Sequence, residues 1–128
     1  MKSLGIVAEV LVVDDSRVMR DMIAACLRPD AGLTITQAAS GLEAIERLSL
    51  QPFDVLVLDL NMPDIGGLEV VEFVRSQDKL AKLPILIVTT RAEDDSRAKI
   101  LAAGASRYMT KPFAPQAILA EVQALLGT

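Results

Sequence analysis

Four apolar runs of this chain each stop at residues whose side chains can do chemistry. The runs and the residues that follow them are 9–13 before Asp14-Asp15, 54–58 before Asp59, 84–88 before Thr89, and 106–110 before Lys111. If these runs are parallel strands of one sheet, their carboxyl ends lie at the same edge of that sheet. Three carboxylates, a hydroxyl and an ammonium then meet in one small volume. This combination suits a divalent cation and a phosphoryl group.

Asp59 is the best candidate for a nucleophile in such a cluster, because it stands alone at the end of a central strand. An aspartate can attack phosphorus and form an acyl phosphate. Positioning and charge neutralisation do most of the work in phosphoryl transfer, so no general base is required. Asp14 and Asp15 are better suited to hold a metal ion, while Thr89 and Lys111 are suited to bind phosphoryl oxygens.

The charges of the cluster point to Mg²⁺. Three neighbouring carboxylates repel one another, and their pKa values rise unless a positive charge lies between them. Mg²⁺ is commonly held by one or two carboxylates, water and a phosphate oxygen. The negative charges of Asp14, Asp15 and Asp59 equal the positive charge of one divalent ion together with the Lys111 ammonium. We therefore predict Mg²⁺ as the cofactor.

Each of these residues also has an ordinary interpretation when it is taken alone. An Asp-Asp pair before a helix commonly caps that helix, an aspartate after a strand commonly forms a turn, and a lysine is usually solvated. These interpretations do not explain why groups of matching chemistry follow four separate runs.

The elements that position these groups alternate along the chain between strand-like runs and segments with helical periodicity. A fifth run, 33–37, alternates as a strand near a sheet edge does. The pattern predicts an α/β fold, namely a flavodoxin-like, doubly wound, five-stranded parallel sheet in the order 2-1-3-4-5 with five helices. In this order, ligands bind between the first and third strands, which end in Asp14-Asp15 and Asp59.

The predicted helices carry start signals, stop signals and apolar faces. The signals are N-caps at 14–16, a capping box of Ser40 and Glu43, Gly104 after a helix around Asp95–Ala103, and Pro115 in the first turn of the last helix. The expected apolar faces are Val18, Met19, Met22, Ile23, Cys26 and Leu27; Leu42, Ile45 and Leu48; Leu68, Val71 and Val74; and Ile118, Leu119, Val122, Leu125 and Leu126. Residues 61–67 are expected to form a loop because of their Pro and Gly content.

Composition narrows the class of protein. A chain of 128 residues with 52% apolar residues predicts one domain with a sheet covered on both faces. The net charge of −4 argues against nucleic acid as a direct partner. The absence of histidine excludes Ser-His hydrolysis, imidazole-based zinc sites and a phosphohistidine carrier. The single cysteine, Cys26, fits a reducing compartment, and no apolar run approaches the ~20 residues of a membrane span. We expect a cytoplasmic protein.

Four stretches of the chain carry a specific resemblance. They are Val12 to Arg17 (VVDDSR), Asp59 to Pro63 (DLNMP), Val88-Thr89, and Tyr108 to Phe113 (YMTKPF). In this order they are similar to response-regulator receiver domains, and among these most similar to the single-domain receivers of chemotaxis. The resemblance implies a receiver domain over residues 1–128 with no output domain.

The resemblance also implies roles for the site residues. Asp59 is implied to accept a phosphoryl group from a histidine kinase, and Thr89 and Lys111 to contact that group. The implied metal ligands are Asp14, partly through water, Asp15, Asp59 and the backbone carbonyl of Asn61. The Lys111-Pro112 peptide bond is implied to be cis.

A switch is a further implication. Thr89 is implied to move toward the phosphoryl group while the Tyr108 ring turns inward, which changes the surface around the fourth helix and fifth strand. The ordinary interpretation of Tyr108, the only tyrosine, is a strand residue that covers apolar surface. A flagellar-motor switch protein is the partner that the resemblance favours. A phosphorelay shuttle and a phosphate sink are the alternatives.

Thr90 and the pair Gly66-Gly67 depart from the usual pattern of the family, and Arg91 and Asn61 occupy positions at which the family varies. Thr90 stands where a smaller residue is usual, and its bulk could restrict access to Asp59. Arg91 lies, like Asn61, where the family tunes the lifetime of the acyl phosphate. Gly66-Gly67 replaces a more usual acidic-Gly pair, and we expect this change to loosen the loop after Asp59.

Two other classes of function stay open. An aspartyl-phosphate-type phosphohydrolase requires a second aspartate two positions after the nucleophile, where this chain has Asn61. An interaction domain that is never phosphorylated does not need the polar cluster at all. We expect a signalling module that is not a turnover enzyme.

Overall fold

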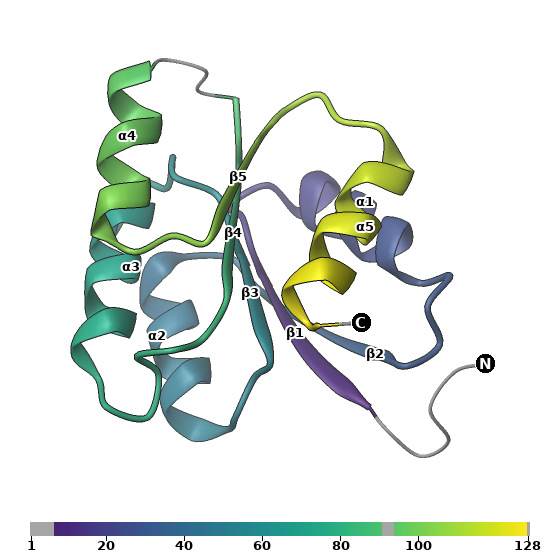
Figure 1. The fold of residues 1–128 in the computed structure, drawn as a ribbon, viewed down its shortest axis with the longest axis horizontal. Coiled ribbons are helices and arrows are strands. Elements are labelled where there is room, and N and C mark those ends of the chain that lie inside the picture. The colour runs from purple at the N-terminus through teal and green to yellow at the C-terminus, as the bar shows by residue number, and fades with distance from the viewer. Residues whose placement is uncertain (1–6, 91–93, 128) are drawn as a thin grey trace.

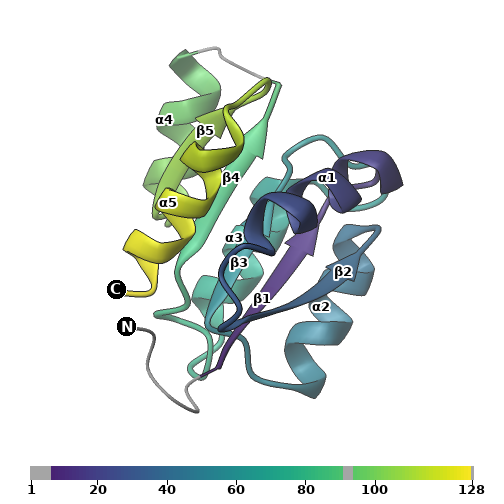
Figure 2. The ribbon, with the colours of Figure 1, turned by 90° about the vertical axis from the view of Figure 1, so that its right-hand side faces the viewer.

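The computed structural model of the chain describes residues 7–90 and 94–127. Five parallel strands form one sheet in the order β2-β1-β3-β4-β5, which confirms the predicted topology. The strands are β1 (Ala8–Val13), β2 (Leu33–Ala38), β3 (Val55–Leu58), β4 (Ile85–Thr89) and β5 (Arg107–Thr110). The helices are α1 (Arg17–Leu27), α2 (Gly41–Leu50), α3 (Gly67–Ser76), α4 (Asp94–Ala103) and α5 (Pro115–Leu125). Helices cover both faces of the sheet, with α1 and α5 on one side and α2, α3 and α4 on the other (Figure 1, Figure 2).

The core has two layers, because successive side chains of a strand point to opposite faces of the sheet. In β1, Leu11 and Val13 pack toward α2, α3 and α4, while Val10 and Val12 pack toward α1 and α5. The central strands β1, β3 and β4 are almost wholly buried, as expected for a parallel sheet with two covered faces. Among the described helices, none is long and apolar enough to cross a membrane.

The strand register brings the predicted site residues together at the carboxyl edge of the sheet. Val13 of β1 lies opposite Leu58 of β3, and the Asp59 amide donates to the Val13 carbonyl at 3.0 Å. On the other side, Thr89 lies opposite Thr110 of β5. The polar residues that follow these strands therefore start from neighbouring positions.

The ends of several helices confirm the signals in the sequence. Ser16 is the N-cap of α1, and the Ser40 hydroxyl caps α2 by accepting from the Glu43 amide at 3.0 Å. The Glu43 carboxylate accepts from the Ala39 amide at 2.8 Å, one residue before the amide that a standard capping box uses. Gly104 follows α4 with a φ of +123°, a conformation that favours glycine.

The expected apolar face of α2 is wrong in one residue. Leu42 is 59% exposed, whereas Ala44 and Leu48 are buried and Ile45 is half-buried. Leu42 lies two positions before Ala44, which places its side chain on the opposite side of a helix with 3.6 residues per turn.

The expected apolar stripe of α1 is also wider than the face that the structure buries. Val18 and Met22 are 75% and 46% exposed, because they lie one turn apart on the flank of the helix. The buried residues of α1 are Ile23, Ala24 and Leu27. Cys26 is half-buried against the layer beneath α1 and α5, and burial raises the pKa of its thiol. This environment fits the interpretation of Cys26 as a small apolar residue.

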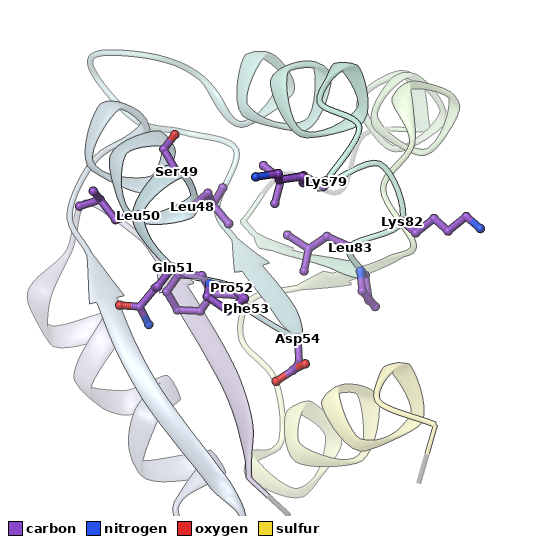
Figure 3. Close-up of a pocket in the computed structure, with 12 residues that line it drawn as sticks. Leu48, Ser49, Leu50, Gln51, Pro52, Phe53, Asp54, Lys79, Lys82 and Leu83 are labelled. Atoms are coloured by element: carbon purple, nitrogen blue, oxygen red, sulfur yellow. The ribbon is translucent and has the colours of Figure 1, made fainter.

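The amino-terminal edge of the sheet carries a cavity of about 590 Å³ (Figure 3). The end of α2 and the segments that lead into β3 and β4 line this cavity. Phe53 and Leu83 contribute apolar walls, and Lys79 and Lys82 come from the segment between α3 and β4. The cavity lies at the end of the sheet opposite to the predicted site.

Candidate functional site

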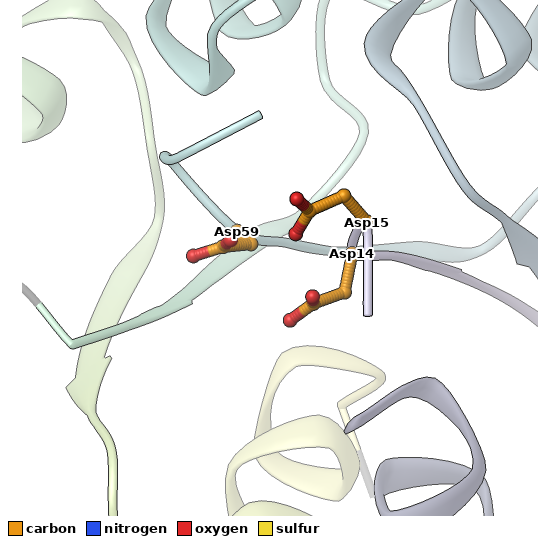
Figure 4. A group of neighbouring side chains, drawn as sticks. All are labelled: Asp14, Asp15 and Asp59. Carbon is orange, nitrogen blue, oxygen red and sulfur yellow. The ribbon is translucent and has the colours of Figure 1, made fainter. Parts of the chain in front are cut away.

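Three carboxylates converge at the carboxyl ends of β1 and β3. One oxygen each of Asp14, Asp15 and Asp59 lies within 4.8 Å of the others. Figure 4 shows the three side chains at the strand ends with their carboxylates turned to the same side. Asp14 and Asp59 are only 2% and 5% exposed, whereas Asp15 is exposed. The cluster therefore has two buried members and one that solvent reaches.

Hydrogen bonds from the surrounding chain hold Asp14 in place. Its Oδ1 accepts from the Ser16 amide at 2.9 Å, and its Oδ2 accepts from Lys111 Nζ at 2.7 Å. Arg20 Nη1 donates to the Asp14 carbonyl at 2.8 Å, and Arg20 Nε donates to Gln37 Oε1 at 3.0 Å. The turn between β1 and α1 is thus tied both to its own helix and to the end of β2.

Lys111 supplies a positive charge between two of the carboxylates. Its Nζ lies 2.7 Å from Asp14 Oδ2 and 3.8 Å from Asp59 Oδ1. The residue follows β5, and its amide donates to the Thr89 carbonyl at 2.8 Å. The Lys111-Pro112 peptide bond is cis, as predicted. The lysine therefore reaches Asp14 and Asp59 from the end of β5, which is separated from β3 by β4.

The pKa of the Asp59 carboxyl is raised above its ordinary value. Burial is the main cause, and the neighbouring charge of Asp14 adds to it. The Lys111 ammonium, the Thr89 hydroxyl and the Asn61 backbone amide act in the opposite direction. The protein thus only partly compensates the negative charge of the Asp59 carboxylate, as expected where carboxylates lie close together.

Thr89 and Asn61 flank Asp59. Thr89 is fully buried at the end of β4, and Asn61 Nδ2 donates to Thr89 Oγ1 at 3.3 Å. Asn61 is exposed two residues after Asp59 in the loop that leads to α3. A hydroxyl, an amide and an ammonium thus surround a single carboxylate.

The composition of the cluster fits a divalent metal ion. All of the clustered ligand atoms are carboxylate oxygens, which are the ligands that hard cations such as Mg²⁺ prefer. Three carboxylates against one ammonium leave negative charge uncompensated, and the raised pKa of Asp59 is consistent with that excess. Asp14, Asp15 and Asp59 could therefore hold a metal.

Tyr108 lies outside this cluster, on β5. It is half-buried against the layer beneath α2, α3 and α4, and the Arg97 guanidinium lies 5.5 Å from the centre of its ring. This distance allows a cation–π interaction. The predicted movements of Thr89 and Tyr108 stay predictions, because one conformation describes only one state.

The positions that depart from the family pattern have different environments. Thr90 is exposed directly after β4, and Arg91 lies outside the described residues. Gly67 is buried, and a Cβ there would lie 2.8 Å from the Asp59 carbonyl oxygen and the Leu60 Cα. Gly66 is the N-cap of α3 and gives that helix no side-chain cap. The glycine at 67 is thus required by close packing.

Two residues that contribute to this region were missed in the sequence. Arg20 supports Asp14, and Asp64 accepts hydrogen bonds from the amides of Gly41 and Leu42. Their partners lie 6 and more than 20 residues away in the chain. The position of Asp64 next to Pro63 suggested only a turn.

Comparisons with known proteins agree with the fold. The sequence matches the family described as response regulator receiver domain over residues 10–123. It is 36% identical to the chemotaxis protein CheY1 of Helicobacter pylori, over 94% of this chain and 98% of that protein. It is 42% identical to the response regulator MprA of Mycobacterium ulcerans, over 91% of this chain and 49% of that protein.

A solved structure gives the same result. The structure is similar to that of the chemotaxis response regulator CheY4 of Vibrio cholerae, with a TM-score of 0.86 and 38% identity, over 93% of this chain and 98% of that one. The predicted fold and family are therefore both confirmed. The chain belongs to the response regulator receiver domain family.

Proposed function

We propose that this protein is a response regulator whose Asp59 accepts a phosphoryl group from a histidine kinase in a Mg²⁺-dependent reaction. The observation that carries the proposal is the position of Asp59, which is buried beside Asp14 and Asp15 with the Lys111 ammonium 3.8 Å away. A nucleophilic carboxylate beside groups that could hold a divalent cation and beside an ammonium that can neutralise phosphoryl oxygens is an arrangement that phosphoryl transfer uses.

The transfer exchanges one bond to phosphorus for another. A carboxylate oxygen of Asp59 attacks the phosphorus of a phosphohistidine, and an O–P bond forms as the N–P bond breaks. The electron pair of the broken bond stays on the donor imidazole, which takes up a proton. Attack of water on the phosphorus later restores the carboxylate and releases inorganic phosphate. Such a protein turns over only its own phosphate, so we do not propose a turnover enzyme.

The other site residues bind and orient the phosphoryl group. Lys111 has a positive charge that stabilises the phosphoryl oxygens, and the Thr89 hydroxyl beside Asp59 can donate to one of them. Asp14, Asp15, Asp59 and the Asn61 carbonyl would hold Mg²⁺. When bound, this ion neutralises charge on the phosphoryl oxygens.

The signal is read out by a partner protein in this proposal. Thr89 and Tyr108 are the switch residues, and phosphorylation shifts a pre-existing equilibrium between two conformations of the β4–α4–β5 surface. We further propose that residues 1–128 form a receiver domain that acts in the cytoplasm. Two relatives named above are called chemotaxis proteins, which supports a flagellar-motor switch protein as the partner.

Acetyl phosphate tests the acceptor directly. With Mg²⁺, the intact protein should gain the mass of one phosphoryl group, and Asp59→Asn should gain none. Asp54→Asn removes a carboxylate at the other end of the same strand and should be labelled like the wild type. Equal labelling of Asp59→Asn and wild type, or no labelling of either, contradicts the proposal.

A second experiment tests the readout. Binding of a purified flagellar-motor switch protein should strengthen when beryllofluoride and Mg²⁺ are added, and this change should be lost in Asp59→Asn. If binding strengthens only for a histidine-containing phosphotransfer protein, the shuttle alternative is favoured. If neither protein responds to beryllofluoride, the switch proposal is wrong.

A further inference from the structure

Asp64 joins the loop after β3 to the start of α2. Its Oδ1 accepts from the Gly41 amide at 3.2 Å, and its Oδ2 accepts from the Leu42 amide at 3.0 Å. These amides belong to the first turn of α2, where backbone donors have no partner within the helix. An aspartate from a distant loop thus provides acceptors at a helix end, beside the cap that Ser40 supplies.

The same carboxylate also accepts from its own loop. The pKa of Asp64 is lowered by the backbone amide of Leu42, then by that of Ile65 and less by that of Gly41. The contact is close, because a Cβ on Gly41 would lie 2.6 Å from the Ile65 carbonyl oxygen and 2.9 Å from its Cβ. The tip of the loop therefore lies directly against the start of α2.

In the sequence, Asp64 follows Asn61 by three residues and the phosphoacceptor Asp59 by five. Within the loop, the Asn61 amide bonds the Asp59 carboxylate, and the Asn61 side chain bonds Thr89. The base of the loop is closed by a bond from the Gly67 amide to the Leu60 carbonyl at 3.1 Å. Asp64 ties the opposite part of the loop, its tip, to a packed helix.

We propose that Asp64 is a positioning residue of the phosphoacceptor loop, which holds Asn61 in place by anchoring the loop tip to α2. The proposal extends the proposed function, since Asn61 bears on Asp59 and on the metal site. Removing a residue that orients metal ligands without binding the metal itself typically weakens metal affinity by ~10-fold or more.

The contact between the loop tip and α2 can be disrupted by a substitution in the loop or by one in the helix. Asp64→Ala removes the acceptors of the Gly41 and Leu42 amides, and we expect about tenfold weaker Mg²⁺ binding. Gly41→Ala leaves the carboxylate in place but forces the loop tip away from α2, and the same direction of change is expected. Asp64→Asn keeps one acceptor oxygen and should lie between Asp64→Ala and wild type.

Asp54→Ala is the matched control. The Asp54 carboxylate is exposed and accepts from a backbone amide, that of Glu9 at 2.7 Å, but it lies at the amino-terminal edge. Titration calorimetry with MgCl₂ should show a weakened affinity for Asp64→Ala and an unchanged one for Asp54→Ala. Affinities that are equal in the two variants overturn the proposal, whether both are unchanged or both are weakened.

A metal-free measurement separates this inference from the proposed function. By NMR, the Asn61 amide should exchange with solvent about tenfold faster in Asp64→Ala than in wild type or Asp54→Ala. Unchanged exchange overturns the role of Asp64, even if the wild type binds Mg²⁺ and is phosphorylated. Faster exchange in a protein that binds no Mg²⁺ supports the role of Asp64 and contradicts the proposed function.

Discussion

Asp54 and Asp59 lie at opposite ends of β3, and their carboxylates have different partners. Asp54 accepts from the Glu9 amide at 2.7 Å. Asp30, which is buried near the same amino-terminal edge, accepts from the Gly32 amide at 2.9 Å and from Gln123 Nε2 at 3.0 Å. Asp59 instead lies among Asp14, Asp15 and Lys111.

The difference separates structural from functional use of the same residue type. At the amino-terminal edge, Asp54 and Asp30 accept hydrogen bonds from neutral donors of the chain, and these bonds stabilise the fold. At the carboxyl edge, three carboxylates share one ammonium, and the excess negative charge can attract a divalent cation. Such sites generally lower stability in exchange for activity.

The largest expected effect comes from the lysine at the carboxyl edge, and a lysine at the amino-terminal edge is its control. Lys111→Met removes the cation beside Asp59 and should slow phosphorylation by acetyl phosphate by about 100-fold, the usual size for loss of one charge-stabilising group. Lys82→Met, at the rim of the cavity in Figure 3, should leave the rate unchanged. The rates are measured by intact mass against time. Equal slowing by both substitutions contradicts the contrast between the edges.

The second prediction concerns stability in the absence of Mg²⁺. Asp30→Ala removes an acceptor from Gly32 and Gln123 and should lower the free energy of unfolding by about 1–3 kcal/mol. Asp59→Asn removes a buried charge that Asp14 repels, and should raise that free energy by on the order of 1 kcal/mol. Urea unfolding with EDTA measures both. A destabilised Asp59→Asn would show that Lys111 compensates the cluster fully.

The sequence predicted the fold and the residues of the cluster because both depend on local patterns. Buried runs of apolar residues define the strands, and residues directly after parallel strands share one edge. Asp59 and Lys111 were found in this way although they are 52 positions apart in the numbering. The expectation needed the strand order alone, without any knowledge of side-chain contacts.

The supporting contacts and the extent of helix burial were less predictable. Leu42 and Val18 have the apolar character of core residues, but the packing of neighbouring helices decides which side is covered. Asp64 and Arg20 have partners that depend on how a loop or a strand end meets a helix. Such contacts have no fixed spacing in the sequence, because tertiary structure creates them.

The third prediction concerns Asp64, which lies at the carboxyl edge. Backbone amides donate hydrogen bonds to its carboxylate, as the Glu9 amide does to the carboxylate of Asp54. The pKa of Asp64 is lowered from an ordinary value of 3.8, so its charged form stabilises the fold fully above about pH 4. This contribution is lost as the pH falls through the lowered pKa. The melting temperature of wild type should therefore exceed that of Asp64→Asn by a constant amount between pH 7 and about pH 5.

Below about pH 4 the two melting temperatures should converge. Thermal unfolding followed by circular dichroism over this range measures the difference. A difference that persists undiminished at low pH would mean that the Asp64 charge does not stabilise the junction with α2.

The smallest expected effect comes from the uncapped start of α3. Gly66 has extended backbone with a φ of −69°, which any residue can adopt, and its own side chain cannot cap the helix as Ser16 and Ser40 cap theirs. Gly66→Asn should stabilise the protein by a few tenths of a kcal/mol. A Cβ at this position would lie 2.7 Å from Glu69 Oε1, so the flexible end of Glu69 must move slightly.

Gly66→Asp turns this small effect into a test of the comparison between the edges. Asp and Asn cap helices about equally well, and a negative charge also suits a helix start. At the carboxyl edge, however, the new charge adds to that of the acidic cluster and of Glu69. Without Mg²⁺, Gly66→Asp should therefore gain less stability than Gly66→Asn, and added Mg²⁺ should narrow the gap. If the aspartate stabilises more than the asparagine in metal-free protein, this edge does not carry the excess negative charge on which the contrast depends.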